Sequence, residues 1–343
     1  MLIFRDLQSL NPKTQGPSVL GLGNFDGLHK GHQDILARIV SRAREENRVA
    51  SVLTFAEHPQ GILRPEAKPL RLMALEHKLA MLAESGIELC CMVSFSPEFA
   101  SLEPEVFVKD VMIGRLGAKR IVLGYNARFG RGRSGDAALM AALAARLDFA
   151  YEELPPVSQN GEDISSSRIR RLVEDGDLKD AAACLGRPFS FLGQVIKGRG
   201  LGRQIGFPTA NLQTEVETLP PYGVYPVLVR EFCLERRETG LAEAVSFKPA
   251  VSWMRGLLNF GLRPTFKEPK AGPVLEVHLL DFKGDLYGKQ LEVALFSRLR
   301  PEEKFQDTEA LKRQIGLDIA EARHFFGCRE SLEGSQKNSF TRS

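Results

Sequence analysis

Residues 21–32 read Gly-Leu-Gly-Asn-Phe-Asp-Gly-Leu-His-Lys-Gly-His, and this stretch decides the fold of the first half of the chain. It follows an apolar run, Val19-Leu20, and precedes an amphipathic run that begins at Ile35, an order that predicts strand, turn and helix. Backbone N–H groups at a helix N-terminus lack intrahelical partners and carry partial positive charge, so they suit phosphate oxygens. Because glycines let a phosphate come close to the backbone, the stretch predicts a phosphate-binding turn.

Two histidines, His29 and His32, lie on either side of Gly31 where the turn becomes the helix. Imidazoles at this position can donate hydrogen bonds to charge that builds up on a phosphoryl group. The motif resembles the HxGH signature of nucleotidylyltransferases, which act at the α-phosphate of a nucleoside triphosphate. The alternative is an ordinary glycine-rich turn with two surface histidines, since short motifs also occur by chance.

Length and composition indicate a globular protein with two domains. The 343 residues are 43% hydrophobic and 26% charged, which is ordinary for a globular protein with material for two cores. The net charge of +3 is too near balance to favour a nucleic-acid partner. No apolar run is long enough to span a bilayer and no signal peptide is evident, so we expect no membrane partner and a cytoplasmic location. A monomer or a weak homo-oligomer is expected.

The cysteines are scattered, and none has the CxxC spacing of a metal site. They are Cys90, Cys91, Cys184, Cys233 and Cys328. Their placement predicts buried or incidental free thiols in a reducing compartment.

Strand-like and helix-like segments alternate along the first half. Strands are expected over 49–55, 89–95, 120–124 and 149–154, and helices over 70–84, 104–113 and 136–147. This alternation predicts an α/β fold with a mostly parallel sheet and helices on both faces. Ligands bind beyond the carboxyl ends of such strands, so the site is expected at the loops 21–32, 55–60, 124–136 and 158–168.

Two of these loops carry arginines. The loop 124–136 contains Phe129 among arginines, and aromatic faces stack on planar rings while guanidinium groups bind phosphate; a solvated surface loop is the alternative. The stretch Ile164-Ser-Ser-Ser-Arg-Ile-Arg170 begins another helix. Serines cap helices well, whereas cations at a helix N-terminus oppose the macrodipole, a conflict that indicates a bound anion. A plain serine N-cap is the alternative.

After Pro188 the pattern becomes all-β. Short β-type runs lie at 190–196, 209–212, 224–229, 256–259, 274–280 and 291–296. They predict an antiparallel barrel or sandwich. A final amphipathic helix is expected from Thr308 to about Phe326. We therefore predict one domain over residues 1–186, a second over 187–327, and a disordered tail over 328–343.

The informative stretch of the second half is Gly198-Arg-Gly-Leu-Gly-Arg-Gln-Ile-Gly-Phe-Pro-Thr-Ala-Asn211. Its glycines allow a loop to wrap around phosphates. Thr209 and Asn211 share one face of a predicted strand, and their oxygens are hard ligands that suit Mg²⁺. Glu276 lies on another predicted strand and can accept a proton from a substrate hydroxyl; an ordinary outward-facing strand residue is the alternative.

Together these motifs resemble the prokaryotic bifunctional riboflavin kinase/FMN adenylyltransferase (FAD synthetase) family. Residues 21–32 resemble its GNFDGxHxGH, 53–59 its TFxPHP, 164–170 its ISSTxIR and 206–212 its GFPTANL. Residues 222–225, 263–266, 281–288 and 299–302 are also family-like. The resemblance implies an N-terminal Rossmann-like nucleotidylyltransferase domain and a C-terminal six-stranded antiparallel flavokinase β-barrel with a terminal helix.

The resemblance implies two reactions that consume ATP. The C-terminal domain would phosphorylate riboflavin to FMN, and the N-terminal domain would adenylylate FMN to FAD and release pyrophosphate. Mg²⁺ is the implied cofactor, ATP the co-substrate, and riboflavin, FMN and FAD the substrates and products.

The same resemblance implies roles for individual residues. His29 and His32 would stabilise the transition state of adenylyl transfer, and Glu276 would be the kinase base. ATP and phosphate in the first domain would contact Gly23, Asn24, Phe25, Asp26, Gly31, Ser165, Ser166, Arg168 and Arg170, and flavin would contact His58, Asn126 and Phe129. Kinase substrates would contact Gly198, Gly202, Phe207, Pro208, Asn259 and Arg300, with the metal on Thr209 and Asn211.

The chain departs from the family pattern at four places, the mildest of which is Asn259-Phe-Gly261 in place of the family's Asn-Ile-Gly. Ala127 replaces an aromatic residue, and Glu57 replaces the first proline of TFxPHP. The segment 231–254 is longer than usual and is expected to form an extended hairpin, to which the sequence assigns no role. Two alternatives stay open: a kinase whose first domain only binds flavin, and a non-catalytic flavin sensor.

Overall fold

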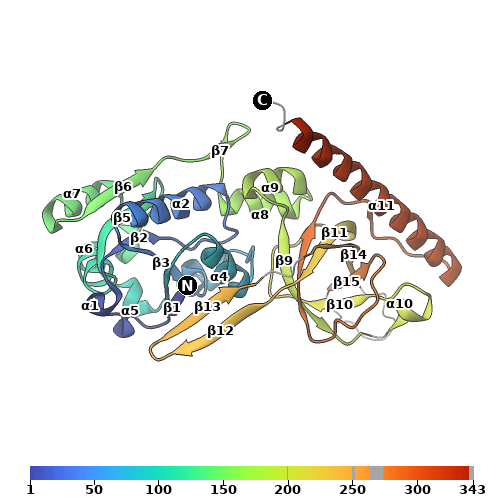
Figure 1. Cartoon of the computed structure of the whole chain (residues 1–343), viewed down its shortest axis with the longest axis horizontal. Helices are drawn as coiled ribbons and strands as arrows, with labels where there is room; N and C mark the ends of the chain where they lie inside the picture. The colour runs from blue at the N-terminus through green and yellow to red at the C-terminus, as the bar shows by residue number, and fades with distance from the viewer. Residues whose placement is uncertain (199, 249–251, 263–272, 340–343) are drawn as a thin grey trace. The chain divides into compact units, whose positions relative to one another are not determined.

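The structure is a computed structural model that describes residues 1–198, 200–248, 252–262 and 273–339 (Figure 1). The chain divides into two compact units. Unit 1 contains Met1–Ile169, Cys184–Gly186 and Leu234–Lys248, and unit 2 contains Arg170–Ala183, Arg187–Cys233 and Pro249–Ser343. Two segments therefore depart from the predicted boundary between residues 186 and 187: Arg170–Ala183 groups with unit 2, and Leu234–Lys248 groups with unit 1.

Unit 1 is built on a sheet with the strand order β12-β13-β1-β4-β3-β2-β5-β6. Six neighbouring strands run parallel, namely β1 (Leu2–Phe4), β4 (Leu89–Val93), β3 (Val49–Phe55), β2 (Ser18–Leu22), β5 (Ala118–Gly124) and β6 (Ala150–Leu154). The predicted parallel sheet is confirmed. The expected hairpin from the segment 231–254 also forms, as β12 (Leu234–Thr239) and β13 (Ala242–Phe247), but it adds to this sheet at β1, which the sequence did not predict.

Helices cover both faces of the parallel strands. The main ones are α2 (Lys30–Glu45), α4 (Leu75–Glu84), the π-helical η3 (Phe107–Ile113) and α7 (Ala137–Leu147). Two further helices, α8 (Ser166–Glu174) and α9 (Leu178–Leu185), lie mostly in the segment that groups with unit 2. Shorter elements are η1 (Leu7–Ser9), α1 (Pro12–Gln15), α3 (Pro59–Leu63), η2 (Pro65–Ala67), α5 (Pro97–Ala100), α6 (Pro104–Val106), η4 (Arg131–Arg133), β7 (Ser158–Gln159) and β8 (Glu162–Asp163).

The adjacent cysteines of β4 show how the two faces are filled. Successive residues of a strand point to opposite sides of the sheet. Cys90 accordingly packs in an apolar cluster with residues of α2 and α4, whereas Cys91 packs in a second cluster with residues of η3 and α7. Burial raises the pKa of the Cys90 thiol to about 12. The prediction of buried free thiols is thus confirmed for Cys90, Cys91 and Cys184, while Cys233 and Cys328 are exposed.

The helix predicted over residues 70–84 begins only at Leu75. The backbone N–H of Leu72 instead donates to both carboxylate oxygens of Asp26, at 3.3 Å each. Leu72 and Met73 are buried all the same. The apolar positions were thus found correctly, but the chain before α4 stays extended because its backbone holds the turn after β2.

Unit 2 is a closed antiparallel barrel, as predicted. Its strands are β9 (Ser190–Ile196), β10 (Ala210–Gln213), β11 (Gly223–Glu231), β14 (Met254–Leu262), β15 (Pro273–Leu279), β16 (Gln290–Leu295) and the short β17 (Arg300–Pro301). Their order is β14-β15-β10-β9-β16-β11-β17, and pairing of β11 with β14 closes the barrel. The family-like residues 263–266 lie outside the described part of the chain.

The terminal helix α11 (Thr308–Ser339) packs on the barrel, where Ala322 is buried with Val224 and Leu257. It continues beyond the predicted end near Phe326, so the predicted disordered tail is helical as far as Ser339. No proline interrupts this stretch to end the helix earlier. Within the described residues, no helix has the length and apolar character required to cross a membrane.

Candidate active sites

The turn after β2 has a strained backbone. Phe25 and Leu28 have φ angles of 53° and 40°, although neither is a glycine. Both side chains are fully buried, so the surrounding core holds them in place. Each such residue costs about 1–3 kcal/mol, and strain of this kind concentrates at functional sites. Gly23 is also required here, because a Cβ atom at this position would lie only 3.0 Å from the Phe25 ring.

The two histidines of this turn form a stacked pair at the start of α2. His29 is the N-cap, and its Nδ1 accepts the backbone N–H of His32 at 3.3 Å. The two imidazoles stack with ring centroids 3.7 Å apart and planes tilted by 17°. A Cβ atom at Gly31 would lie 3.3 Å from the His29 ring, so a larger residue there would push against the pair.

The protonation state of the pair follows from its surroundings. Burial, together with the neighbouring charges of His29 and Lys78, holds the pKa of His32 well below its ordinary value. His32 is therefore neutral at neutral pH. Because Nδ1 of His29 accepts a hydrogen bond, a neutral His29 carries its proton on Nε2. The helix N-terminus thus presents a neutral His32 imidazole stacked on the imidazole of His29.

The second serine-rich segment lies against the same turn. The hydroxyl of Ser166 donates to the carbonyl oxygen of Asp26 at 2.9 Å, across 140 residues of sequence. Ser165 caps α8, because its Oγ accepts the backbone N–H of Arg168 at 3.2 Å. The N-terminus of α8 and the turn before α2, which the resemblance assigned to the same ATP, therefore lie in direct contact.

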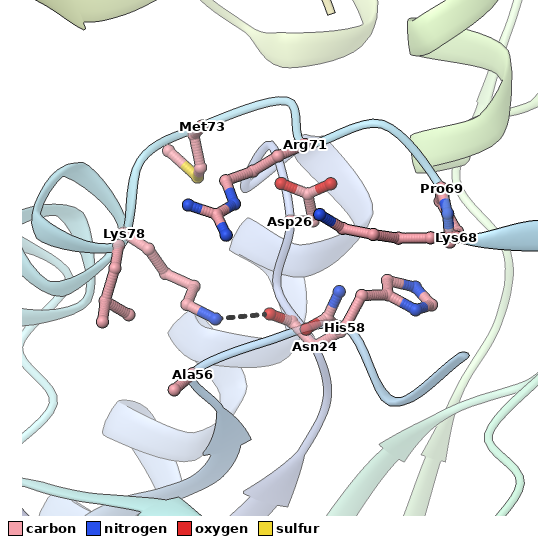
Figure 2. Close-up of a pocket in the computed structure, with 10 residues that line it drawn as sticks. Asn24, Asp26, Ala56, His58, Lys68, Pro69, Arg71, Met73 and Lys78 are labelled. Carbon is pink, nitrogen blue, oxygen red and sulfur yellow. Dashed lines mark hydrogen bonds between the residues drawn. The ribbon is translucent and has the colours of Figure 1, made fainter. Parts of the chain in front are cut away.

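A pocket opens beside this turn (Figure 2). It is lined by Asn24, Asp26, Ala56, His58, Lys68, Pro69, Arg71, Met73, Leu75 and Lys78. In Figure 2 the side chains of Lys68, Arg71 and Lys78 point into the same opening as Asp26. Cationic groups gathered in one pocket favour a bound phosphate. Neither His29 nor His32 is among the residues that line this pocket.

Lys78 was missed at the level of sequence. Its Nζ donates to the carbonyl oxygens of Phe55 at 2.7 Å and Asn24 at 3.1 Å, and lies 3.5 Å from the hydroxyl of Thr54. Burial lowers its pKa to about 8. A signal was present, since Lys78 follows Leu75 by three residues and so lies on the apolar face of the predicted helix.

In unit 2, strand register brings three predicted polar residues together. Asn211 of β10 and Asn259 of β14 are both directly opposite Glu276 of β15. Residues paired in this way have Cβ atoms about 5 Å apart on one face of the sheet. Leu275 and Val277 are buried on the other face, so the polar trio lies away from the apolar interior of the barrel.

The side chain of Asn211 has an unsatisfied buried acceptor. Asn211 is 7% exposed, and among the described residues its buried Oδ1 has no hydrogen-bond partner. Buried polar atoms nearly always have a partner, so an orphan acceptor fits a ligand that binds there, and an amide oxygen suits Mg²⁺. Gly198 is required at this point, because any Cβ atom would collide with the Asn211 amide.

The loop before β10 is folded back on itself. The backbone N–H of Phe207 donates to the carbonyl oxygen of Gly202 at 2.8 Å. A Cβ atom at Gly202 would come within 3.1 Å of the Thr209 hydroxyl. The loop is also held by His278, whose Nδ1 lies 2.8 Å from the carbonyl oxygen of Pro208. Sequence reasoning missed His278, although it lies two residues beyond Glu276 and shares its strand face.

Comparison with known proteins identifies the family. The FAD synthetase family matches residues 11–168, and the riboflavin kinase family matches residues 185–326. The bifunctional riboflavin kinase/FMN adenylyltransferase of Escherichia coli K12 is 36% identical over 327 residues, which cover 95% of this chain and 98% of the relative. The chain belongs to the bifunctional riboflavin kinase/FMN adenylyltransferase family.

Other relatives agree over the same span. The protein of this name from Haemophilus influenzae is 34% identical over 326 residues, covering 95% of this chain and 99% of the relative. A crystal structure titled as a macrolide-efflux protein from Streptococcus pneumoniae is similar in fold, with a TM-score of 0.77 and 29% identity over 94% of this chain and 98% of that chain. We refer to unit 1 as the adenylyltransferase unit and to unit 2 as the kinase unit.

The predicted flavin contact Phe129 of the adenylyltransferase unit is buried in this structure. Phe129 is 4% exposed and packs in the apolar core, with its ring centroid 6.2 Å from that of Phe107. It does not present a face for stacking, because its backbone pairs with Gly135 and turns the ring inward. Asn126 in the same loop is exposed. The partly exposed aromatic residues at the carboxyl end of β4 are Phe95 and Phe99, which the sequence did not single out.

Two arginines that were predicted to contact substrates have partners within the fold. The guanidinium of Arg168 donates to the carbonyl oxygens of Gln159 and Glu162, at 3.0 and 2.8 Å, and so holds the β7–β8 hairpin. In the kinase unit, Arg300 makes a bidentate pair with Asp318 of α11, with both contacts at 2.8 Å. Both guanidinium groups thus have partners within the fold, and their contacts with substrate stay predictions. Arg170 is buried at 9% exposure.

Proposed function

We propose that each unit of this family member works through its own polar cluster, so that the two reactions occur at separate sites. The observation that carries the proposal is the register of the barrel, which puts Asn211 and Glu276 side by side in the kinase unit. The adenylyltransferase unit has its own cluster at the N-terminus of α2. The substrates are riboflavin and ATP for one site, and FMN and ATP for the other.

In the kinase unit, Glu276 accepts the proton of the riboflavin 5′-hydroxyl as this oxygen attacks the γ-phosphorus of ATP. Thr209 and Asn211 hold Mg²⁺, which when bound neutralises charge on the phosphates. The loop over residues 200–208 wraps the triphosphate, and His278 keeps that loop beside Glu276. FMN and ADP are the products.

In the adenylyltransferase unit, a phosphate oxygen of FMN attacks the α-phosphorus of ATP and pyrophosphate leaves. The N-terminal N–H groups of α2 and the imidazoles of His29 and His32 stabilise the charge on the phosphoryl group. Lys68 and Arg71, at the pocket rim, neutralise the triphosphate. No covalent intermediate with the protein is required, because positioning and charge neutralisation suffice for this chemistry.

We place the enzyme in the cytoplasm, as a monomer or weak homo-oligomer, with neither nucleic acid nor a membrane as a partner. The small net charge of +3 supports the absence of a nucleic-acid partner. It does not bear on the compartment or the oligomeric state.

The deciding experiment is an incubation with riboflavin, ATP and Mg²⁺, followed by chromatographic separation of the flavins. FMN should appear first and FAD second. FMN that accumulates without FAD would refute the N-terminal activity and leave a kinase only. Supplying FMN directly with ATP and measuring pyrophosphate tests that alternative separately, and any turnover rules out a non-catalytic flavin sensor.

A further inference from the structure

The β12–β13 hairpin is inserted between two barrel strands of the kinase unit, yet it completes the sheet of the adenylyltransferase unit (Figure 1). β13 pairs antiparallel with β1, with Ala244 opposite Leu2. The backbone N–H of Val245 donates to the carbonyl oxygen of Met1 at 2.9 Å, and the N-terminal amino group donates back to the Val245 carbonyl at 3.1 Å. Without the hairpin, β1 would be an open edge strand.

Side chains of the hairpin reach α4. Val245 is 3% exposed and belongs to the same apolar cluster as Leu79 and Leu82 of α4. Arg236 of β12 pairs with Glu76 of α4 at 3.2 Å and with Glu243 of β13 at 2.8 Å. The hairpin therefore contacts α4 by an apolar and an ionic route.

Helix α4 in turn carries Lys78, which connects two parts of the nucleotide site. Lys78 donates to the carbonyl oxygen of Asn24, in the turn before α2, and to that of Phe55, at the carboxyl end of β3. Lys78 is 6% exposed, so water cannot replace these two carbonyl partners if α4 shifts. The position of the nucleotide turn thus depends on where α4 lies.

We propose that the β12–β13 hairpin is a positioning element for adenylyl transfer: by holding α4, it keeps Lys78 on the carbonyl oxygens of Asn24 and Phe55. The hairpin touches none of the reacting atoms and acts through Lys78. The segment that the sequence found unusually long in the kinase half therefore serves the other reaction. This inference rests on the assignment of adenylyl transfer to the pocket beside α2.

The test measures both activities in the full-length protein. The first variant replaces residues 234–248 by a short Gly-Ser turn, and the second is Val245→Ala, which keeps the hairpin. FAD formation from FMN should fall at least about tenfold in the first variant, because small displacements at a reacting centre cost rates of this order. FMN formation should stay within about twofold, which shows that the kinase unit is folded, and circular dichroism of the variant reports on the fold of the adenylyltransferase unit. Arg237→Ala, on the same strand but exposed, is the matched control.

A double-mutant cycle separates positioning from general stability. Val245→Ala should lower FAD formation in the wild-type background but have no further effect in a Lys78→Met background, because both changes remove the same constraint. Additive effects, an equal loss of both activities, or unchanged FAD formation after hairpin removal would each overturn the proposal. The single variant His29→Ala reports separately on the site assignment: unchanged FAD formation there would show that adenylyl transfer occurs elsewhere.

Discussion

The substitution Asn211→Ala tests the kinase site most directly, because the structure predicts opposite effects on activity and on stability. The Oδ1 atom of Asn211 is buried and has no hydrogen-bond partner within the part of the chain that the structure describes. An unsatisfied buried acceptor lowers the free energy of unfolding by about 1–3 kcal/mol, and the alanine variant is free of this penalty. Truncation also removes some packing, so we expect the free energy of unfolding to be unchanged or to rise by up to about 2 kcal/mol.

Activity should move the other way. Loss of an oxygen ligand to Mg²⁺ beside Glu276 should lower FMN formation at least about 100-fold, the range seen when one charge-stabilising group is removed from an active site. FAD formation from added FMN should be unaffected, since that site lies in the other unit. Stability is measured by thermal unfolding with and without ATP and Mg²⁺, and nucleotide should stabilise the wild type but not the variant.

Gln213→Ala is the matched control, because Gln213 lies two residues further along β10 on the same face and is exposed. It should change neither property. A loss of stability together with a loss of both activities in Asn211→Ala would show that Asn211 is a structural residue. Normal FMN formation in the variant would remove Asn211 from the kinase site altogether.

Three further predictions concern other parts of the chain. His29→Ala should lower FAD formation about 100- to 1,000-fold and leave FMN formation intact, as measured by flavin chromatography; loss of both activities in a folded variant would argue against independent sites. Arg300→Ala should leave Asp318 buried without its cationic partner and destabilise the kinase unit by about 3 kcal/mol in thermal unfolding. A change confined to the KM for flavin would instead show that Arg300 binds substrate. Lys78 has a pKa of about 8 against an ordinary 10.5, so the unfolded chain holds more protons between these values and the stability contribution of Lys78 rises with pH there. FAD formation should nevertheless decline above about pH 8 as Lys78 loses its charge, and Lys78→Arg, which stays charged, should abolish that decline if it folds with the same contacts.

Elements set by local pattern could be predicted from the sequence. The strand over residues 49–55 has the predicted bounds, and the predicted parallel sheet and closed barrel both form. The turn before α2 and the serine cap of α8 also lie where their motifs placed them. These features depend on alternation, helical periodicity and capping, which act over a few residues and are therefore visible in the chain itself.

The outcomes that differed involve partners that the local sequence pattern does not indicate. Phe129 is an aromatic residue of a loop, but its ring packs in the neighbouring apolar core. Arg168 and Arg300 were predicted to contact substrates, but in this structure they donate to a carbonyl and a carboxylate group of the fold. Lys78 becomes a site residue only because α4 packs where the carboxyl ends of β2 and β3 meet.

The sequence by itself determined which local elements form, where phosphate can bind and which family the motifs resemble, because each of these depends on residues close together in the chain. Only the tertiary structure decided which polar side chains have partners within the fold. It also decided that Asn211, Asn259 and Glu276 share one face and that the β12–β13 hairpin pairs with β1. The physical reason is that a hydrogen-bond donor or an apolar surface has many possible partners, and long-range packing selects one of them.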